Sequence, residues 1–390
     1  GIVNVVDNTI ARKDFEESTF RLGLEVQTVN DGDSHDFSYQ NNIGGFNVSA
    51  AYKDSKFGDY DIPNGAVIHH EEEHEGEEEG DHEGEEHEED MGYLPNSDAG
   101  STAQRLGISK AGDWGYFGVS ISDTENLYGI PFHGDSHEEH EDEDGDDHAD
   151  EDEHEGEDEH EGERIFSKTE SNVINVDGSY VVGNSWLTKI DYRFRDSDYS
   201  HTEQHAEEEA HEGEEDGDDL HEEGPTTFTN NAKEYGAIFD LGNDSLSQKV
   251  AVNYVVEDIS VIGDEAFINP TESKELTLGY YLSKDLDLFH VDLGIRYDQI
   301  SRNGSVSHEE EHDEGHADEH DDDHEAEIEF FDRDIDTTSY ALTLSNDINE
   351  FLEVSLGLSS VERAPSAVEL LMNGPHLATG RVEVGNFNLK

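Results

Sequence analysis

Four stretches of the chain consist almost entirely of Asp, Glu, His and Gly, and they hold most of its 23 histidines. These acidic tracts span residues 69–90, 133–163, 201–223 and 308–327. Neutral imidazole mixed with carboxylate is a donor set for zinc, copper, nickel, manganese or cobalt, whereas carboxylate alone suits calcium or magnesium. Because an acidic tail needs no histidine to stay soluble, the mixture predicts capture of a divalent metal, with zinc favoured.

The spacing of the histidines within the tracts is irregular, so the tracts define no single cage. They raise the local concentration of ligands instead, as an antenna for cations. The alternative is a solvated charge run that binds calcium at the surface. The predicted metal ligands, to which one histidine outside the tracts is added, are His69, His70, His74, His82, His87, His133, His137, His140, His148, His154, His160, His201, His205, His211, His308, His312, His316, His320 and His376.

The composition limits which classes of partner the chain can bind. A formal net charge of -78, from 22 Lys and Arg against 100 Asp and Glu, excludes nucleic acid, whose phosphates need basic partners. The same charge attracts cations. There is no cysteine, so disulfides and thiolate metal sites are excluded. Charge of this density cannot be buried without partners, and we expect the tracts to be disordered.

Between the tracts, apolar and polar residues alternate with the two-residue period of β-strands. Examples are the segments 20–26, 46–53, 117–122, 289–297 and 353–358. No run of about 18 apolar residues exists that would form a transmembrane helix. The chain begins without Met and ends at Lys390, and we expect it to be part of a longer protein.

The connections between the predicted strands alternate between short and long. The long ones fall at 54–101, 123–167, 198–231, 257–272 and 299–335, and all four acidic tracts lie in them. The short ones include Gly178–Ser185, and the strand expected after this turn includes Trp186, Ile190 and Phe194. In an up-and-down meander alternate connections share one end, so every tract should project from one rim. Short turns at one end and long loops at the other are typical of a transmembrane antiparallel β-barrel.

We therefore predict an all-β fold: part of a larger barrel, with about 13 strands and a fourteenth starting near Val382. The apolar stripe of each strand would face lipid and the polar stripe a lumen. A soluble all-β repeat protein with acidic insertions is the alternative. This alternative does not explain why all the acidic insertions would lie at the same end of the strands.

Several segments resemble one family, the TonB-dependent outer-membrane receptors of Gram-negative bacteria. GIVNVVDN (1–8) resembles the last strand of their plug domain, and FGDYDIPNG (57–65) and NLYGIP (126–131) resemble their first extracellular loops. ERAPSAVELLMNGPHLATGRVEVGNFNLK (362–390) resembles a marked segment of their barrel. The resemblance implies the end of a plug domain and a linker at 1–13 and a partial receptor barrel at 14–390.

Acidic, histidine-rich extracellular loops further resemble the zinc-uptake branch of this family. The resemblance implies a receptor embedded in outer-membrane lipid that imports zinc or a related metal as cargo, not as a catalytic cofactor. Import would be driven by the TonB–ExbB–ExbD complex acting through the plug. A partial barrel alone would not transport.

Two other functions fit the same residues. One is a surface or secreted metal-buffering protein without transport, and the other is a siderophore-type receptor of the same family. No enzyme signature is present, since the sequence has no nucleophile elbow and too many acidic pairs to single out one for catalysis.

A firmer metal site would need ligands held by strands. His376, in NGPHLATG, lies outside the tracts and is the first candidate. His290 is a weaker one, placed on the lumen face by the two-residue period. His133 could begin a site at the rim with His137 and His140.

Overall fold

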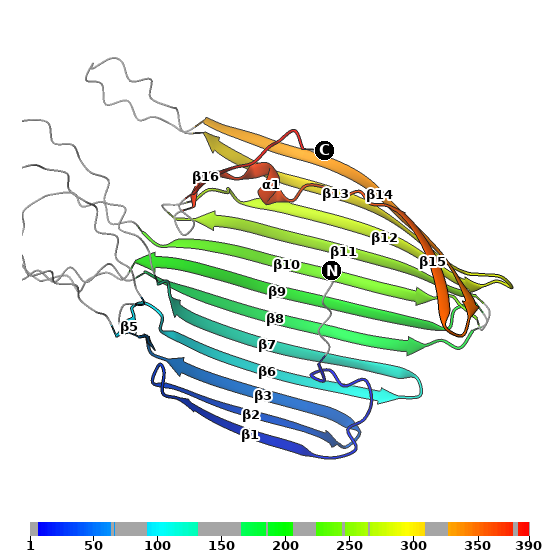
Figure 1. Cartoon of the computed structure of the whole chain (residues 1–390), viewed down its shortest axis with the longest axis horizontal. Helices are drawn as coiled ribbons and strands as arrows, with labels where there is room; N and C mark the ends of the chain where they lie inside the picture. Colours follow the sequence, from blue (N-terminus) through cyan, green and yellow to red (C-terminus); the bar gives the residue numbers. More distant parts are fainter. Residues whose placement is uncertain are drawn as a thin grey trace, which may run out of the picture.

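A computed structural model describes residues 7–63, 66, 92–131, 165–184, 186–205, 224–243, 246–263, 266–308, 327–376 and 381–389. Thirteen strands form one antiparallel sheet in which every strand pairs with the next one along the chain (Figure 1). They are β1 (Thr19–Gln27), β2 (Gly32–Ile43), β3 (Phe46–Phe57), β6 (Ala99–Gly112), β7 (Gly115–Gly129), β8 (Ile165–Val181), β9 (Lys189–His205), β10 (Thr226–Asp240), β11 (Ser247–Ile262), β12 (Thr271–Asp285), β13 (His290–His308), β14 (Glu327–Asn349) and β15 (Leu352–Ser360). The predicted partial barrel of about 13 antiparallel strands is confirmed.

One face of the sheet is apolar and exposed. Residues paired directly across antiparallel strands lie on the same face, and the register aligns Ala50, Leu106, Ile121 and Ile174 across four successive strands. Leu106 and Ile121 are about half exposed, at 53% and 50%. Further along the sheet another row runs through Tyr192, Ala237, Val252 and Leu278. Such rows form the outward-facing apolar band of a membrane barrel. We call this side the outer face.

The end of the sheet with the short connections carries exposed aromatic residues. The turns and strand ends there, which we call the short-turn end, include Phe46, Trp114, Trp186, Phe289 and Phe351. Both tryptophans of the protein lie at this end. Outer-membrane barrels carry girdles of aromatic residues at both edges of their apolar band, and tryptophan collects at the boundary between lipid and water. The position of these residues therefore marks one edge of the membrane.

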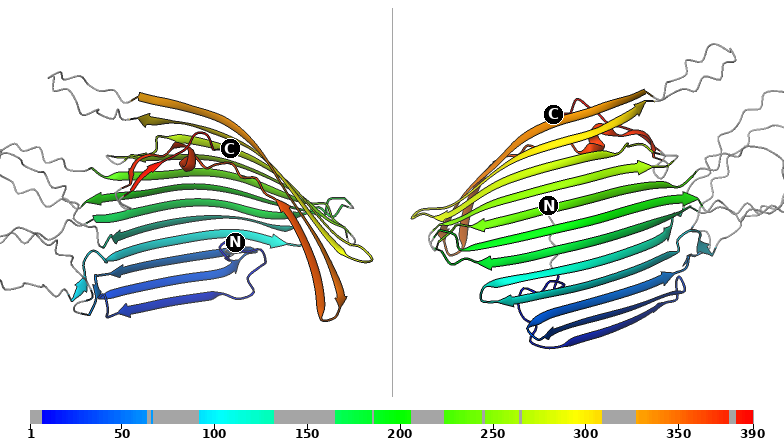
Figure 2. Two further views of the ribbon diagram at one scale, coloured as in Figure 1. Left: turned by 45° about the horizontal axis from the view of Figure 1, so that its top comes forward. Right: turned by 180° about the vertical axis from the view of Figure 1, so that it is seen from behind.

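The opposite face, here called the inner face, is largely polar. One row of register partners on it runs through Ser49, Gly107, Ser120, Asn175 and Arg195. Two segments outside the sheet, residues 7–15 and the described residues of 361–389, lie against this face (Figures 1 and 2). The alternation of the sequence therefore separates a lipid side from a side that holds other parts of the chain.

Small and polar residues of the wall hold segment 7–15. Ser49 Oγ donates to the carbonyl of Thr9 over 2.7 Å, and Ser109 Oγ donates to the carbonyl of Ala11 over 2.7 Å. A Cβ added to Gly107 would lie 2.0 Å from the same Thr9 carbonyl oxygen. The backbone thus approaches the wall closely because a glycine is present there.

Segment 361–389 contains the helix α1 (Ala367–Leu371) and the hairpin of β16 (Asn373–His376) and β17 (Arg381–Val384). Ser366 caps α1, accepting from the backbone N–H of Glu369 while the Glu369 side chain accepts from the Ser366 backbone. Leu370 and Leu371 are buried in a cluster with four residues of the wall and its loops: Val261, Phe267, Ile268 and Val306. The segment is thereby packed onto the inner face.

The structure corrects three details of the predicted strands. The strand expected near Val382 forms as β17, but it pairs with β16 and does not extend the sheet. The turn expected at Gly178–Ser185 lies later, because β8 continues to Val181 and the chain reverses at Gly183, whose φ is 70°. Trp186 therefore lies in the turn and not in β9.

The long connection predicted at 257–272 is also shorter than expected, because β11 extends to Ile262. The last inner-face residues of β11, Ile259 and Val261, are apolar and interrupt the alternation of apolar and polar residues that marks the other strands. They are apolar because they pack beneath α1. The remaining described strands, β4 (Tyr60–Asp61) and β5 (Tyr93–Leu94), pair with each other between β3 and β6. No helix in the described part of the chain is long and apolar enough to cross a membrane.

Candidate metal-binding site

The four acidic tracts are attached at one end of the sheet. They lie between β4 and β5, β7 and β8, β9 and β10, and β13 and β14, and the tracts at 201–223 and 308–327 begin within β9 and at the end of β13. In this meander successive connections alternate between the two ends, so the strand ends beside all four tracts lie together, opposite the short-turn end (Figure 1). We call this the long-loop end. In outer-membrane barrels long loops face the outside of the cell.

Most of the predicted ligands lie outside the described residues. His201, His205, His308 and His376 fall within described strands, and the side chain is described for His201. The remaining predicted ligands, which are not described, are His69, His70, His74, His82, His87, His133, His137, His140, His148, His154, His160, His211, His312, His316 and His320.

The imidazole of His201 lies on the inner face of β9 and is largely enclosed, with its side chain 18% exposed. Its Nδ1 lies 3.0 Å from Thr169 Oγ1 and 3.2 Å from Ser167 Oγ, both on β8. Its Nε2 lies 3.1 Å from Glu203 Oε1, two residues further along β9. Ser167 Oγ also lies 3.3 Å from Nε2. Nδ1 thus faces two hydroxyls, and Nε2 faces a carboxylate and one of the same hydroxyls.

Aromatic packing supports His201 from the neighbouring strand. The ring of Phe228, its register partner on β10, lies 5.5 Å from the imidazole. Phe228 in turn lies 5.6 Å from Phe267, whose carbonyl accepts from the backbone N–H of Asn373 in β16. The hairpin that carries His376 is therefore tied to the same part of the wall as His201.

Two further predicted ligands occupy strand ends at the long-loop end. His308 is the last residue of β13 and is paired with Glu327 of β14, and His376 is paired with Arg381 in the small hairpin. Within the described side chains there is no group of three or more His, Cys, Asp or Glu that would hold a metal. His201 and Glu203 supply two such donors.

The sequence reasoning missed Glu203 as a partner of His201. The signal was present in the run HTEQH, since residues 201, 203 and 205 share one face of a strand with a two-residue period. It was hidden because this run also begins one of the acidic tracts, and the end of β9 could not be placed.

His290 lies at the short-turn end and therefore far along the sheet from the tracts. His290 lies on the inner face, as predicted. It shares that face with Asp292, two residues further along β13, and with Asp285, its register partner on β12. Its Nδ1 lies 2.6 Å from Asp285 Oδ1 and its Nε2 lies 3.2 Å from Asp292 Oδ1. With each ring nitrogen against a separate carboxylate, the imidazole bridges two acids and does not share one coordination sphere with them.

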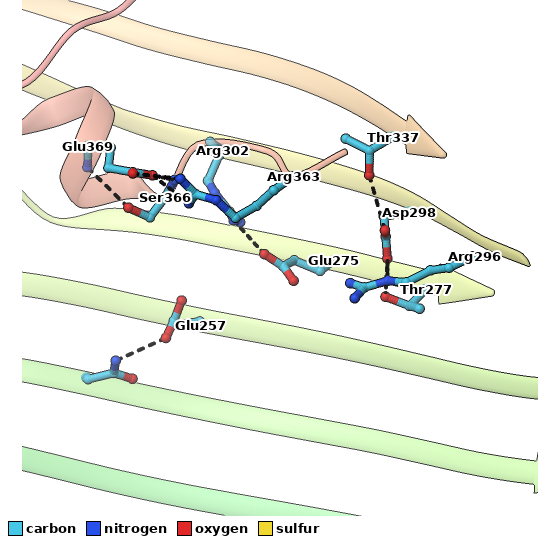
Figure 3. A network of polar contacts seen from close by, with 11 residues as sticks. Glu257, Glu275, Thr277, Arg296, Asp298, Arg302, Thr337, Arg363, Ser366 and Glu369 are labelled. Carbon is cyan, nitrogen blue, oxygen red and sulfur yellow. Dashed lines mark hydrogen bonds and ion pairs between the residues drawn. The ribbon is translucent and has the colours of Figure 1, made fainter. Parts of the chain in front are cut away.

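Ion pairs and hydrogen bonds stiffen the inner face around α1 (Figure 3). The buried carboxylate of Asp298 accepts from Arg296 over 2.7 Å and from two threonines, Thr277 over 2.6 Å and Thr337 over 3.1 Å. Buried Arg302 donates to Glu275 over 2.5 Å. These contacts join β12, β13 and β14 into a polar wall.

Outside the sheet, Arg363 donates to both carboxylate oxygens of Glu369 over 2.8 Å (Figure 3). Together with the bond from the Ser366 backbone, this pairing lowers the pKa of Glu369 to about 2. The Glu369 carboxylate, which closes the capping box of α1, is therefore charged at neutral and mildly acidic pH.

Comparison with protein families gives one match, over residues 97–390, to the model of the TonB dependent receptor-like β-barrel. The chain belongs to this family. Its members are outer-membrane receptors and not enzymes, which confirms both the location and the non-catalytic role indicated by the sequence. A comparison with curated protein sequences gives no match.

Solved receptor barrels show the same fold at low sequence identity. The haemophore receptor HasR of Serratia marcescens has a TM-score of 0.60 and 11% identity, covering 99% of this chain and 51% of its own. The iron transporter FrpB of Neisseria meningitidis has a TM-score of 0.56 and 11% identity, and the match covers 92% of this chain and 47% of FrpB. The copper transporter OprC has a TM-score of 0.54 and 9% identity, and the match covers 91% of this chain and 48% of OprC. This receptor barrel spans about half the length of those chains.

Proposed function

We propose that this receptor barrel imports a divalent transition metal, with zinc as the favoured cargo, and that its acidic tracts capture the ion outside the cell. The observation that carries the proposal is the attachment of all four tracts at the long-loop end. A shared end lets them act on one entrance, which a protein that only buffers metal does not require.

The type of metal follows from the donors. Imidazole among carboxylates favours zinc and its neighbours over calcium, and His201 shows one such pair of donors on the inner face. The Irving–Williams order prevents affinity alone from selecting one transition metal. The copper transporter OprC supports the use of this fold for a metal ion. The plug end at 1–13 and drive by TonB, ExbB and ExbD belong to the same proposal.

A peptide of residues 133–163 tests the capture step. Titration calorimetry with zinc and with calcium should show much tighter binding of zinc. The zinc affinity should fall as the pH drops below the ordinary histidine pKa of about 6.5, because protonated imidazole does not bind metal. Equal affinities for the two ions would remove zinc capture from the proposal.

Import is tested with the receptor expressed from its own gene in zinc-starved cells that are given radioactive zinc. The informative variant replaces the histidines of the four tracts with glutamine, except His201 and His205 of β9, and so keeps the carboxylates and the length. Zinc accumulation should fall severalfold in this variant and should disappear without TonB. Normal zinc accumulation in cells that lack the receptor, with loss of a ferric chelate instead, would favour the siderophore-type receptor.

A further inference from the structure

We propose that His201 and Glu203 form a metal-binding site on the inner face of the barrel, which takes ions from the acidic tracts and starts their passage inward. This site deepens the proposed metal import and rests on it. The histidines of the tracts have no regular spacing, whereas the backbone of β9 fixes the positions of these two donors. A site held by strands binds with a geometry that a tract cannot provide.

The distance between the two donors suits one ion. Zinc bound tetrahedrally at about 2.0–2.2 Å from each ligand separates neighbouring donor atoms by roughly 3.4 Å. His201 Nε2 and Glu203 Oε1 are 3.1 Å apart, so a shift of a few tenths of an ångström lets one ion bind both atoms. Both side chains are 18% exposed, so the ion would be largely withdrawn from water.

The opposite side of the ring is arranged as in known metal sites. A metal-bound histidine almost always has its second nitrogen fixed by an oxygen, which sets the ring orientation and its tautomer. Thr169 Oγ1, 3.0 Å from Nδ1, occupies that position from the adjacent strand. Phe228 packs against the imidazole and limits its rotation.

The strand period provides the next donor position. Residue 205 follows Glu203 by two residues in β9 and is a third residue of the same face, also a histidine. It is the last residue of the strand and adjoins the rest of the tract 201–223. The backbone of β9 therefore places positions 205, 203 and 201 in a line that runs from the long-loop end of the strand into the sheet.

Crystals of the receptor expressed from its own gene, soaked with a small excess of zinc, test the site directly. Data collected at the zinc absorption edge should show an anomalous peak about 2.0–2.2 Å from His201 Nε2 and Glu203 Oε1. The peak should vanish in His201→Ala. It should weaken in Thr169→Val, because loss of an orienting partner typically lowers metal affinity by about tenfold or more.

Zinc uptake by cells separates this inference from the proposed import. His201→Ala should lower uptake severalfold while the zinc retained by the other tract histidines stays unchanged. His290→Ala is the matched control, an inner-face histidine at the opposite end, and should leave both measurements unchanged. Normal import with no peak at His201 would overturn the site and leave import standing. A peak at His201 without import would retain the site and overturn the function.

Discussion

At the scale of single residues, the inner wall is shaped by what it lacks as much as by what it carries. Gly107 leaves room for the backbone of Thr9, and serines on either side donate to the passing carbonyls. The absence of a side chain thus determines where segment 7–15 can lie. Such a role is invisible in the sequence, where Gly107 is one more polar-face residue of an alternating strand.

Gly107→Val should displace segment 7–15 from the wall, because the new Cβ would collide with a backbone oxygen that cannot rotate away. The protein has no cysteine, so Ala11→Cys can report the change. Ala11 is 4% exposed, and its thiol should be protected from a maleimide in the parent and react rapidly in the Gly107→Val variant.

The matched control is Gly294→Val, which changes another inner-face glycine with nothing within 4 Å of the added Cβ. It should leave the thiol at position 11 protected. Equal protection in both valine variants would contradict the proposed close approach at Gly107.

The pair of Glu369 and Arg363 gives segment 361–389 a dependence on acidity. The pKa of Glu369 in the folded protein, about 2, lies below the ordinary value of 4.5. Its contribution to stability is therefore complete above pH 4.5 and is lost as the pH falls toward 2. Pepsin, which is active over this range, can report the loss by cutting between Leu370 and Leu371.

In Glu369→Gln this protection should be weak already at pH 4.5, and the parent and the variant should be cut at the same rate near pH 2. Val368→Ala is the control, since Val368 is partly exposed on the same helix. It should follow the parent. A difference between parent and Glu369→Gln that persists at pH 2 would show that another contact of Glu369 dominates.

At the scale of elements, each strand has a lipid side and a lumen side, and the two sides differ in what they tolerate. Leu278→Arg, on the outer face of β12, should destabilise the barrel by about 2–4 kcal/mol if it lies near the bilayer midplane. Gly294→Arg, on the inner face of β13, should cost far less because the site is open and polar. Urea titration of the folded receptor in lipid vesicles measures both.

Most of the strands could be predicted from the sequence because lipid and lumen impose opposite demands on alternate residues. The prediction was wrong where that rule is broken by packing inside the barrel. Ile259 and Val261 are apolar on the inner face because α1 covers them. The sequence predicts a new barrel strand near Val382, where β17 lies, but the pairing partner of β17, and not its composition, decides its place.

The candidate site was predictable in its chemistry and not in its location. The histidines of the tracts indicate metal, but irregular spacing cannot show which of them a strand holds. His201 becomes distinct only when register brings Thr169 beside it. Whether the undescribed histidines bind metal stays a prediction.

At the scale of the whole molecule, charge is distributed very unevenly along the barrel axis. The tracts hold most of the 100 acidic residues and attach at one end, whereas the described turns at the short-turn end are tight and carry few carboxylates beside their aromatic rings. Carboxylates are costly to move through hydrocarbon. Unfolded receptor added to empty lipid vesicles should therefore insert with its tight turns leading, in a single orientation. A protease added afterwards from outside should trim every tract, and none should be sheltered in the vesicle interior.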